Sequence, residues 1–163
     1  MDAEDWTGLA LVQPTRKREW ELRQGDRLVA ELRLPSMRRG GTASVGEREL
    51  EIRVSGVLRV EHLVVDVQSG ETVARVRRNT LERPGLENST WRSLGRGQGR
   101  GFVGADGEPW LRAKVSSGFF RRTGQVEVEP EHDVGLPALL AAYLLIRKAE
   151  EDESAAVTTV VVT

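Results

Sequence analysis

Five arginines in the middle of the chain are the residues whose chemistry the sequence presents most plainly. Arg75 and Arg77 lie two apart and alternate with Ala74 and Val76, so both side chains are expected on one face of a strand. A further pair of arginines follows the aromatic pair Phe119–Phe120. Guanidinium groups bind phosphate oxygens through two parallel hydrogen bonds. The pattern predicts a surface for anionic headgroups made of these residues: Arg75, Arg77, Arg78, Arg121 and Arg122.

The charge distribution supports this surface and also offers an alternative to it. Residues 72–122 hold 11 basic and 4 acidic side chains, although the whole chain has a net charge of −1. Of the 24 basic residues 21 are arginine, a bias that genome composition can produce without any function. The same arginines could therefore lie on a solvated outer wall and form ion pairs with the glutamates of neighbouring strands.

A glycine-rich stretch, GRGQGRGFVG at 95–104, contains Gly99, Gly101 and Gly104 in the spacing of a dinucleotide fingerprint. That fingerprint needs a helix directly after it, to hold the pyrophosphate at the helix N-terminus. Here ADGEPWLRAKV follows, which reads as a turn and a strand, so we reject the fingerprint. Arg96 and Arg100 beside an aromatic residue also resemble a short RG-rich nucleic-acid tract. A glycine-rich loop leading into a strand is the favoured interpretation.

The two histidines are the other titratable residues that could do chemistry. His62 is in register with apolar neighbours on a strand, so we expect it to be partly buried and hydrogen bonded. His132 lies between Glu131 and Asp133, but adjacent strand residues point to opposite faces, which argues against a metal site. No cysteine is present, which excludes disulfides and thiolate chemistry. With no evident nucleophile–base pair, we expect no enzyme activity, no cofactor and no metal.

The elements that position these residues are strands. Apolar and polar residues alternate with period 2 over 19–23, 28–34, 49–54 and 125–129, the pattern of strands with one buried face. Longer β-rich runs cover 57–67 and 73–78, and short turn signals such as QGD, VGE and ADGE separate the runs. We expect a mainly β protein: a closed antiparallel β-barrel of about 10–12 strands.

One segment near the C-terminus breaks this pattern. Val134–Ile146 is apolar on every side apart from Tyr143, yet its 13 residues are too few for a membrane span, which takes about 20. Leucine and alanine favour a helix, Asp133 can cap its start, and Pro137 falls within the first turn. A helix with no polar face must be buried all round. We therefore expect a central helix over 134–149, inside the barrel.

A β-barrel closed around one hydrophobic C-terminal helix resembles the tubby C-terminal-like superfamily, which includes the phospholipid scramblases and LURP-one-related proteins. The resemblance covers about Trp20 to Lys148, with hairpins around Gly25, Gly70 and Gly107 and the strand QVEVEPEHD leading into GLPALLAAYLLIRK. It implies a non-enzymatic barrel, and some relatives bind phosphoinositides through basic side chains on the barrel wall. The chain departs from the family in continuing past the helix and in lacking an acidic loop that resembles a calcium site.

These observations predict one domain with two flanking segments: a flexible N-terminal segment over 1–15, the barrel over 16–149, and a tail over 150–163. The tail is acidic and then β-branched, so we expect residues 155–163 to be disordered or to add a strand. The start MDAEDW has no apolar stretch, so we expect a cytoplasmic protein without a transmembrane span, peripheral to a membrane at most.

The expected function is a binding or scaffolding module whose partner is an anionic phospholipid or phosphoinositide surface, or an acidic protein. Two alternatives stay open. One is a small-ligand or enzyme barrel with its site in the 79–100 region, which a lumen filled by the helix disfavours. The other is a nucleic-acid-binding module that uses the arginines of 92–102, which we consider the weaker alternative. The sequence leaves the oligomeric state open.

Overall fold

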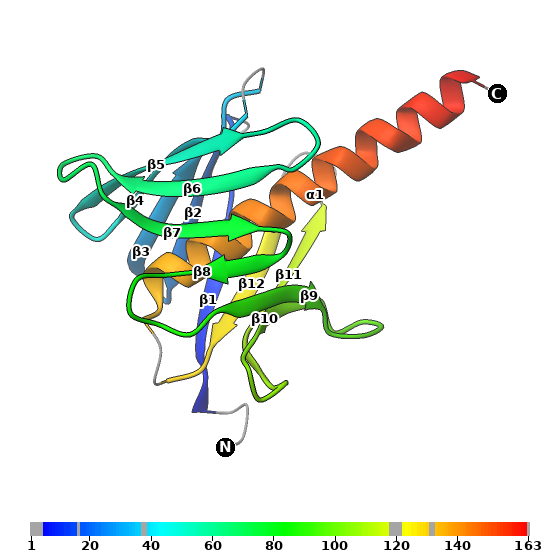
Figure 1. The fold of residues 1–163 in the computed structure, drawn as a ribbon. Helices are drawn as coiled ribbons and strands as arrows, with labels where there is room; N and C mark the ends of the chain where they lie inside the picture. The colour runs from blue at the N-terminus through cyan, green and yellow to red at the C-terminus, as the bar shows by residue number, and fades with distance from the viewer. Residues whose placement is uncertain (1–4, 16, 37–38, 118–121, 131–132, 163) are drawn as a thin grey trace.

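The computed structural model describes the chain except for residues 1–4, 16, 37–38, 118–121, 131–132 and 163. Among the described residues, twelve strands form one closed antiparallel barrel, in which each strand pairs with its neighbours in sequence and β1 also pairs with β12 (Figure 1). The expected closed barrel of about 10–12 strands around a C-terminal helix is confirmed. The strands are β1 (Thr7–Val12), β2 (Glu19–Gln24), β3 (Arg27–Arg33), β4 (Gly41–Val45), β5 (Arg48–Ser55), β6 (Glu61–Asp66), β7 (Thr72–Arg77), β8 (Thr80–Glu82), β9 (Ser89–Ser93), β10 (Arg100–Val103), β11 (Pro109–Ser117) and β12 (Arg122–Val128).

Alternation along the strands produces the barrel interior. Trp20 and Leu22 of β2 are buried, while their neighbours in the strand are more exposed. Leu28 of β3 departs from the predicted pattern, because it is 41% exposed and Val29 is buried instead. The pairing of β2 with β3 shifts register between Leu22 and Arg23, and such a bulge turns the following side chains to the other face.

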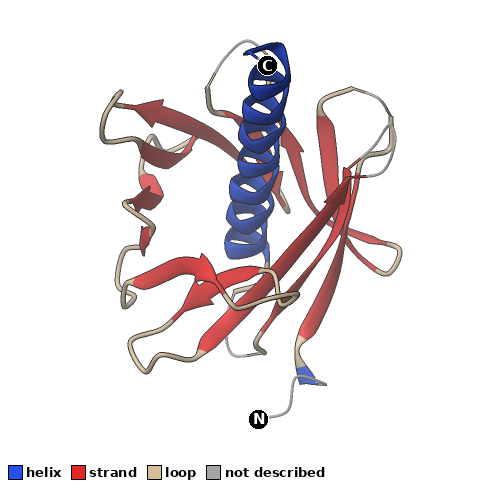
Figure 2. Cartoon of the chain, turned by 90° about the vertical axis from the view of Figure 1, so that its right-hand side faces the viewer, coloured by secondary structure: helices blue, strands red, loops and turns tan. Residues whose placement is uncertain are grey.

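The helix α1 (Gly135–Val162) runs through the barrel (Figure 2). Residues 138–142 of the helix have no exposed surface at all, and Tyr143 is 1% exposed. Their side chains form one core with the inward-facing residues of the strands. The lumen is therefore filled by the helix, as the absence of a polar face predicts.

Two of the predicted boundaries are wrong. Thr7–Val12 is not a flexible segment, because it forms β1, with Leu9 and Leu11 buried in the core. The helix does not end at residue 149 but continues to Val162, so residues 155–162, expected to be disordered or to add a strand, are helical, and Thr163 lies outside the described residues. Extending an existing helix adds one hydrogen bond per residue, whereas β-branched residues cost only a fraction of a kcal/mol, about 0.5 each, in helix propensity.

The up-and-down topology divides the connecting segments between two ends of the barrel. The described parts of the segments after β1, β3, β5, β7 and β9 lie at the end where α1 leaves the barrel, here called the exit end. The segments after the even-numbered strands lie at the opposite end, where α1 begins, here called the entry end. At the exit end the last part of α1 projects beyond the strands (Figure 1).

Candidate functional site at the exit end

The structure places the predicted arginines on two different surfaces. Arg75 lies on the outer wall with its Nε 2.7 Å from Glu61 Oε1, and Arg77 Nη2 lies 3.6 Å from Glu82 Oε1. The salt-bridged wall is therefore the better description of these two. Arg78 instead occupies the turn between β7 and β8, with a φ of 51°. Arg121 lies outside the described residues, and Arg122 begins β12 but its side chain is not described.

The connecting segments at the exit end carry only positive charge. Within the described part of these segments there are six basic residues and no acidic one. The entry end shows the opposite bias, since the described part of its connecting segments holds eight acidic residues and one basic residue, Arg83. The connecting segments are thus basic at one end of the barrel and acidic at the other, while α1 adds Glu150, Glu151 and Asp152 at the exit end. The exit-end residues are Lys17, Arg18, Arg39, Arg59, Arg78 and Arg96.

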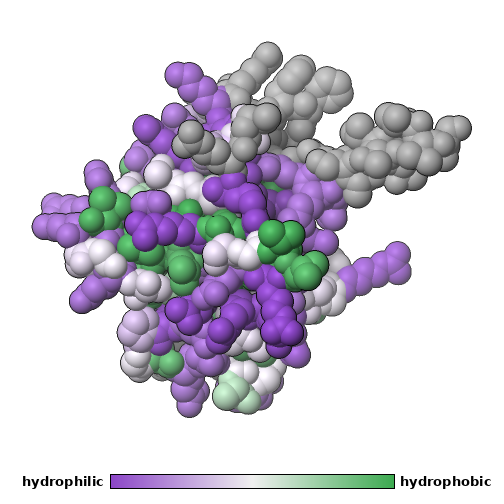
Figure 3. Space-filling view, turned by 45° about the horizontal axis from the view of Figure 1, so that its top comes forward, coloured by the Kyte–Doolittle hydropathy of each residue, from purple (hydrophilic) through white to green (hydrophobic). Residues whose placement is uncertain are grey.

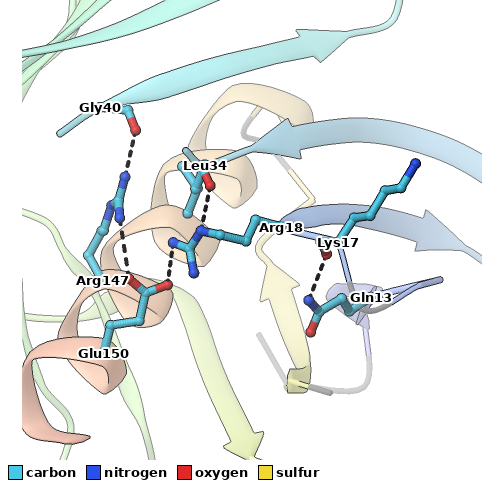
Figure 4. Close-up of polar contacts among 7 residues, drawn as sticks. All are labelled: Gln13, Lys17, Arg18, Leu34, Gly40, Arg147 and Glu150. Atoms are coloured by element: carbon cyan, nitrogen blue, oxygen red, sulfur yellow. Dashed lines mark hydrogen bonds and ion pairs between the residues drawn. The ribbon is translucent and has the colours of Figure 1, made fainter. Parts of the chain in front are cut away.

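One of the six basic residues at the exit end, Arg18, forms an ion pair with the helix α1. Arg18 donates from Nε to the carbonyl oxygen of Leu34 at 2.6 Å and from Nη2 to Glu150 of the helix at 2.6 Å (Figure 4). Arg147 binds the same carboxylate at 3.3 Å and donates to the carbonyl oxygen of Gly40 at 2.7 Å (Figure 4). Both arginines therefore fix the helix to the loops.

The remaining five basic side chains have no carboxylate partner within the described residues. Arg39 donates to a backbone oxygen, that of Gly56, at 2.9 Å, and no ion pair joins any of the five to a described acid. Their charge is available to an external anion, and we call them the exit-end cations. They are Lys17, Arg39, Arg59, Arg78 and Arg96.

Two large apolar side chains lie exposed beside these cations. Val57 is 88% exposed and Leu58 is 98% exposed, both in the segment that joins β5 to β6. A tight turn presents them: Gly56 has a φ of 86°, and a side chain there would lie 2.2 Å from the carbonyl oxygen of Arg59. Figure 3 shows hydrophobic groups emerging among hydrophilic ones on the face of the molecule in view. Exposed apolar residues next to cations are a combination that suits a bilayer interface.

A cavity of about 750 Å³ opens where the helix leaves the barrel, lined by Arg39, His62, Tyr143 and Arg147 among others. A hydrogen bond of 2.8 Å joins His62 Nδ1 to the Tyr143 hydroxyl, which confirms the predicted partly buried, hydrogen-bonded histidine. Burial lowers the pKa of His62, and the charges of Arg39 and Arg147 lower it further. Burial raises the pKa of Tyr143, against an opposing effect of Arg147. Both groups are thus held neutral near pH 7.

The lowered pKa of His62 predicts a pH-dependent stability. The folded state binds the His62 proton more weakly than the unfolded state, so this contribution to stability is present above the ordinary pKa of 6.5 and is lost as the pH falls through and below it. We expect the free energy of unfolding to fall between pH about 7.5 and about 5, and to fall less in His62→Gln. Denaturant unfolding at the two pH values measures this difference. An equal loss in both proteins would contradict the assignment.

The glycine-rich stretch at 95–104 has a structural explanation in the backbone of the sheet. Gly101 lies in β10, where a side chain would lie 2.1 Å from the carbonyl oxygen of Leu111, and β11 follows the next turn rather than a helix. The rejection of the dinucleotide fingerprint is confirmed. Among the described residues no cluster of three or more histidine, aspartate or glutamate side chains could hold a metal ion, and His132 lies outside them.

Comparison with known proteins identifies no relative. No family model matches the chain, and neither a curated protein nor a solved structure matches it. None of the helices that the structure describes is long and apolar enough to cross a membrane.

The sequence analysis did not single out Lys17, Arg39 and Arg59, because each lies alone in its own loop, and it considered Arg96 only for the nucleic-acid alternative. Only Arg78 belongs to the predicted set. The order of the strands could have revealed these cations. In an up-and-down barrel every second connection lies at the same end, so the charges of alternate connections have to be added together.

Proposed function

We propose that this protein is a non-enzymatic, tubby-like binding module that docks its exit end on an anionic phospholipid surface. The observation that carries the proposal is the separation of charge between the two ends of the barrel, with basic connections at one end and acidic connections at the other. The negative potential of a membrane attracts the basic connections and repels the acidic ones, which favours an orientation with the exit end toward the bilayer.

The expected binding energy is adequate for reversible association. Each basic residue near an anionic bilayer contributes about 1 kcal/mol, so the five exit-end cations together supply roughly 5 kcal/mol before screening. Val57 and Leu58 can add to this by entering the interface, because burying one such side chain is worth about 1.5–3 kcal/mol. The apolar pair favours a bilayer over an acidic protein or a nucleic acid as the partner, since neither of those needs a fully exposed leucine.

The nucleic-acid alternative lacks comparable support. Arg100 lies over the ring of Trp91, with 5.8 Å between the guanidinium carbon and the ring centroid, and Trp91 is itself buried. A buried tryptophan cannot serve as a platform on which bases stack. Arg92 and Arg96 are exposed, but no exposed described aromatic residue accompanies them.

Vesicle flotation tests the proposal. We expect the protein to float with vesicles that contain phosphatidylserine, not to float with pure phosphatidylcholine, and to dissociate as salt is added, because counterions screen exposed charges. Absence of flotation at low salt would overturn the proposal, as would equal flotation with both vesicle types. Single-stranded RNA that competes fully for the protein at low salt would favour the nucleic-acid alternative instead.

A further inference from the structure

A second cavity, of about 820 Å³, lies at the entry end, outside the lumen that the helix fills. Trp6 from the N-terminal segment, Arg83 and Leu86 from the β8–β9 connection, and Asp106 and Trp110 from around the β10–β11 turn all contribute to its wall. Cavities of this size hold small organic ligands. The 79–100 region that the sequence singled out for a small-ligand site therefore does supply one wall of a cavity.

Arg83 is the unusual residue in this wall. It is the one basic residue in the described entry-end connections, and none of the described carboxylates forms an ion pair with it. Its Nε is buried and has no hydrogen-bond partner among the described residues. Burial lowers its pKa, and the charge of Asp133 only partly opposes this effect. A half-buried guanidinium with an unsatisfied donor is costly unless an anionic group compensates it.

Two tryptophans line the cavity: Trp6 is partly exposed, whereas Trp110 is only 4% exposed. The Arg83 guanidinium carbon lies 4.8 Å from the ring centroid of Trp110, whose Nε1 donates to Ser89 Oγ at 2.9 Å. The guanidinium carbon of Arg112 lies 4.6 Å from the ring centroid of Trp6. Arg112 is already neutralised, because its Nη2 donates to Glu127 at 2.9 Å. Arg83 is thus the cation in this wall that has no ion-pair partner among the described residues.

The carboxylates around the cavity restrict the charge of a ligand. Glu87, Asp106 and Glu108 also line it, and Asp106 is held in place by the backbone N–H of Glu108 at 3.0 Å. Their negative potential repels a ligand of net negative charge, such as a phosphate or a simple carboxylate. A ligand that also carries a cation does not incur this penalty.

We propose that the entry-end cavity binds a zwitterion, an amino acid or short peptide with an aromatic side chain, whose carboxylate pairs with Arg83. The ammonium group faces the acidic residues of the β10–β11 turn, and the aromatic ring packs against the partly exposed Trp6 and the exposed Leu86. This site lies at the opposite end from the proposed membrane-docking surface and does not depend on it.

Calorimetric titration with three matched probes tests the charge requirement. Phenylalanine carries both charged groups, phenylacetate lacks the ammonium, and phenethylamine lacks the carboxylate. We expect phenylalanine to bind at least about tenfold more tightly than either, since each charge-assisted hydrogen bond contributes about 1.5–3 kcal/mol. If phenethylamine bound as tightly as phenylalanine, the role of Arg83 would be overturned. If phenylacetate bound as tightly as phenylalanine, the role of the carboxylates would be overturned. If neither phenylalanine nor glycylphenylalanine showed saturable binding, the site itself would be overturned.

The variant Arg83→Gln tests the same site through ligand binding and through its melting temperature, and the second measurement needs no ligand. We expect the variant to bind phenylalanine at least about tenfold more weakly while its melting temperature stays the same or rises, because a half-buried charge without a described ion-pair partner has been removed. The matched control is Arg92→Gln on the exposed side of β9, which should leave phenylalanine binding unchanged. A lower melting temperature for Arg83→Gln would show that the charge is structurally compensated, and would overturn the proposal.

Discussion

Replacing Ala141 with aspartate should prevent the barrel from folding. Ala141 has no exposed surface, and the side chains around it belong to the continuous apolar core between α1 and the strands. A carboxylate at this position meets neither water nor a described cation, and the barrel cannot open locally to admit water without separating strands from the helix. The cost of an uncompensated buried charge, several kcal/mol, is comparable with the about 5–15 kcal/mol that stabilises a whole domain.

Circular dichroism and thermal unfolding measure this effect. We expect Ala141→Asp to show no cooperative transition, or to be recovered only as aggregate. The matched control is Lys148→Asp, which places the same side chain on the exposed face of the same helix and should retain cooperative unfolding, with a change within about 1 kcal/mol. An Ala141→Asp protein that melts like the parent would disprove the burial of the helix within the barrel.

Reversing two exit-end charges, Arg39→Glu with Arg59→Glu, should weaken binding to anionic vesicles by about a hundredfold or more. Each reversal changes the local charge by two, so the pair alters the electrostatic attraction by roughly 4 kcal/mol before screening, and screening by salt reduces this value. Neither side chain forms an ion pair with a described residue, and the one printed contact that is lost is the hydrogen bond from Arg39 to the carbonyl oxygen of Gly56, whose effect the melting temperature reports.

A control with the same net charge separates orientation from overall charge. Arg27→Glu with Arg48→Glu makes the same change in charge at the start of β3 and of β5, where both strands leave the entry end, and it also removes the 3.4 Å ion pair of Arg48 with Asp66. We expect this double variant to bind vesicles within a few-fold of the parent. Equal weakening by both double variants would mean that net charge, and not the exit end, determines binding. Flotation at low salt, with melting temperatures measured in parallel, gives the comparison.

Much of the fold follows from the sequence, because the two controlling patterns are local. Period-2 alternation determines which strand face is buried, and a segment that is apolar all round has to be enclosed. The error at Leu28 arises from a bulge, which depends on the pairing of two strands and is not encoded in either alone. The error beyond residue 149 arises because a helix started in the core continues through residues whose own preference for a strand is small.

The candidate site depended on tertiary structure to a greater extent. By itself the sequence determined a closed barrel, its central helix, an excess of arginine and a partly buried His62. Only the folded chain decided that Arg75 and Arg77 are neutralised on the wall by Glu61 and Glu82, while Arg39, Arg59 and Arg78 come together at one end. The physical reason is that alternation acts between neighbouring residues, whereas a binding surface sums charges from loops that only barrel closure brings to the same side.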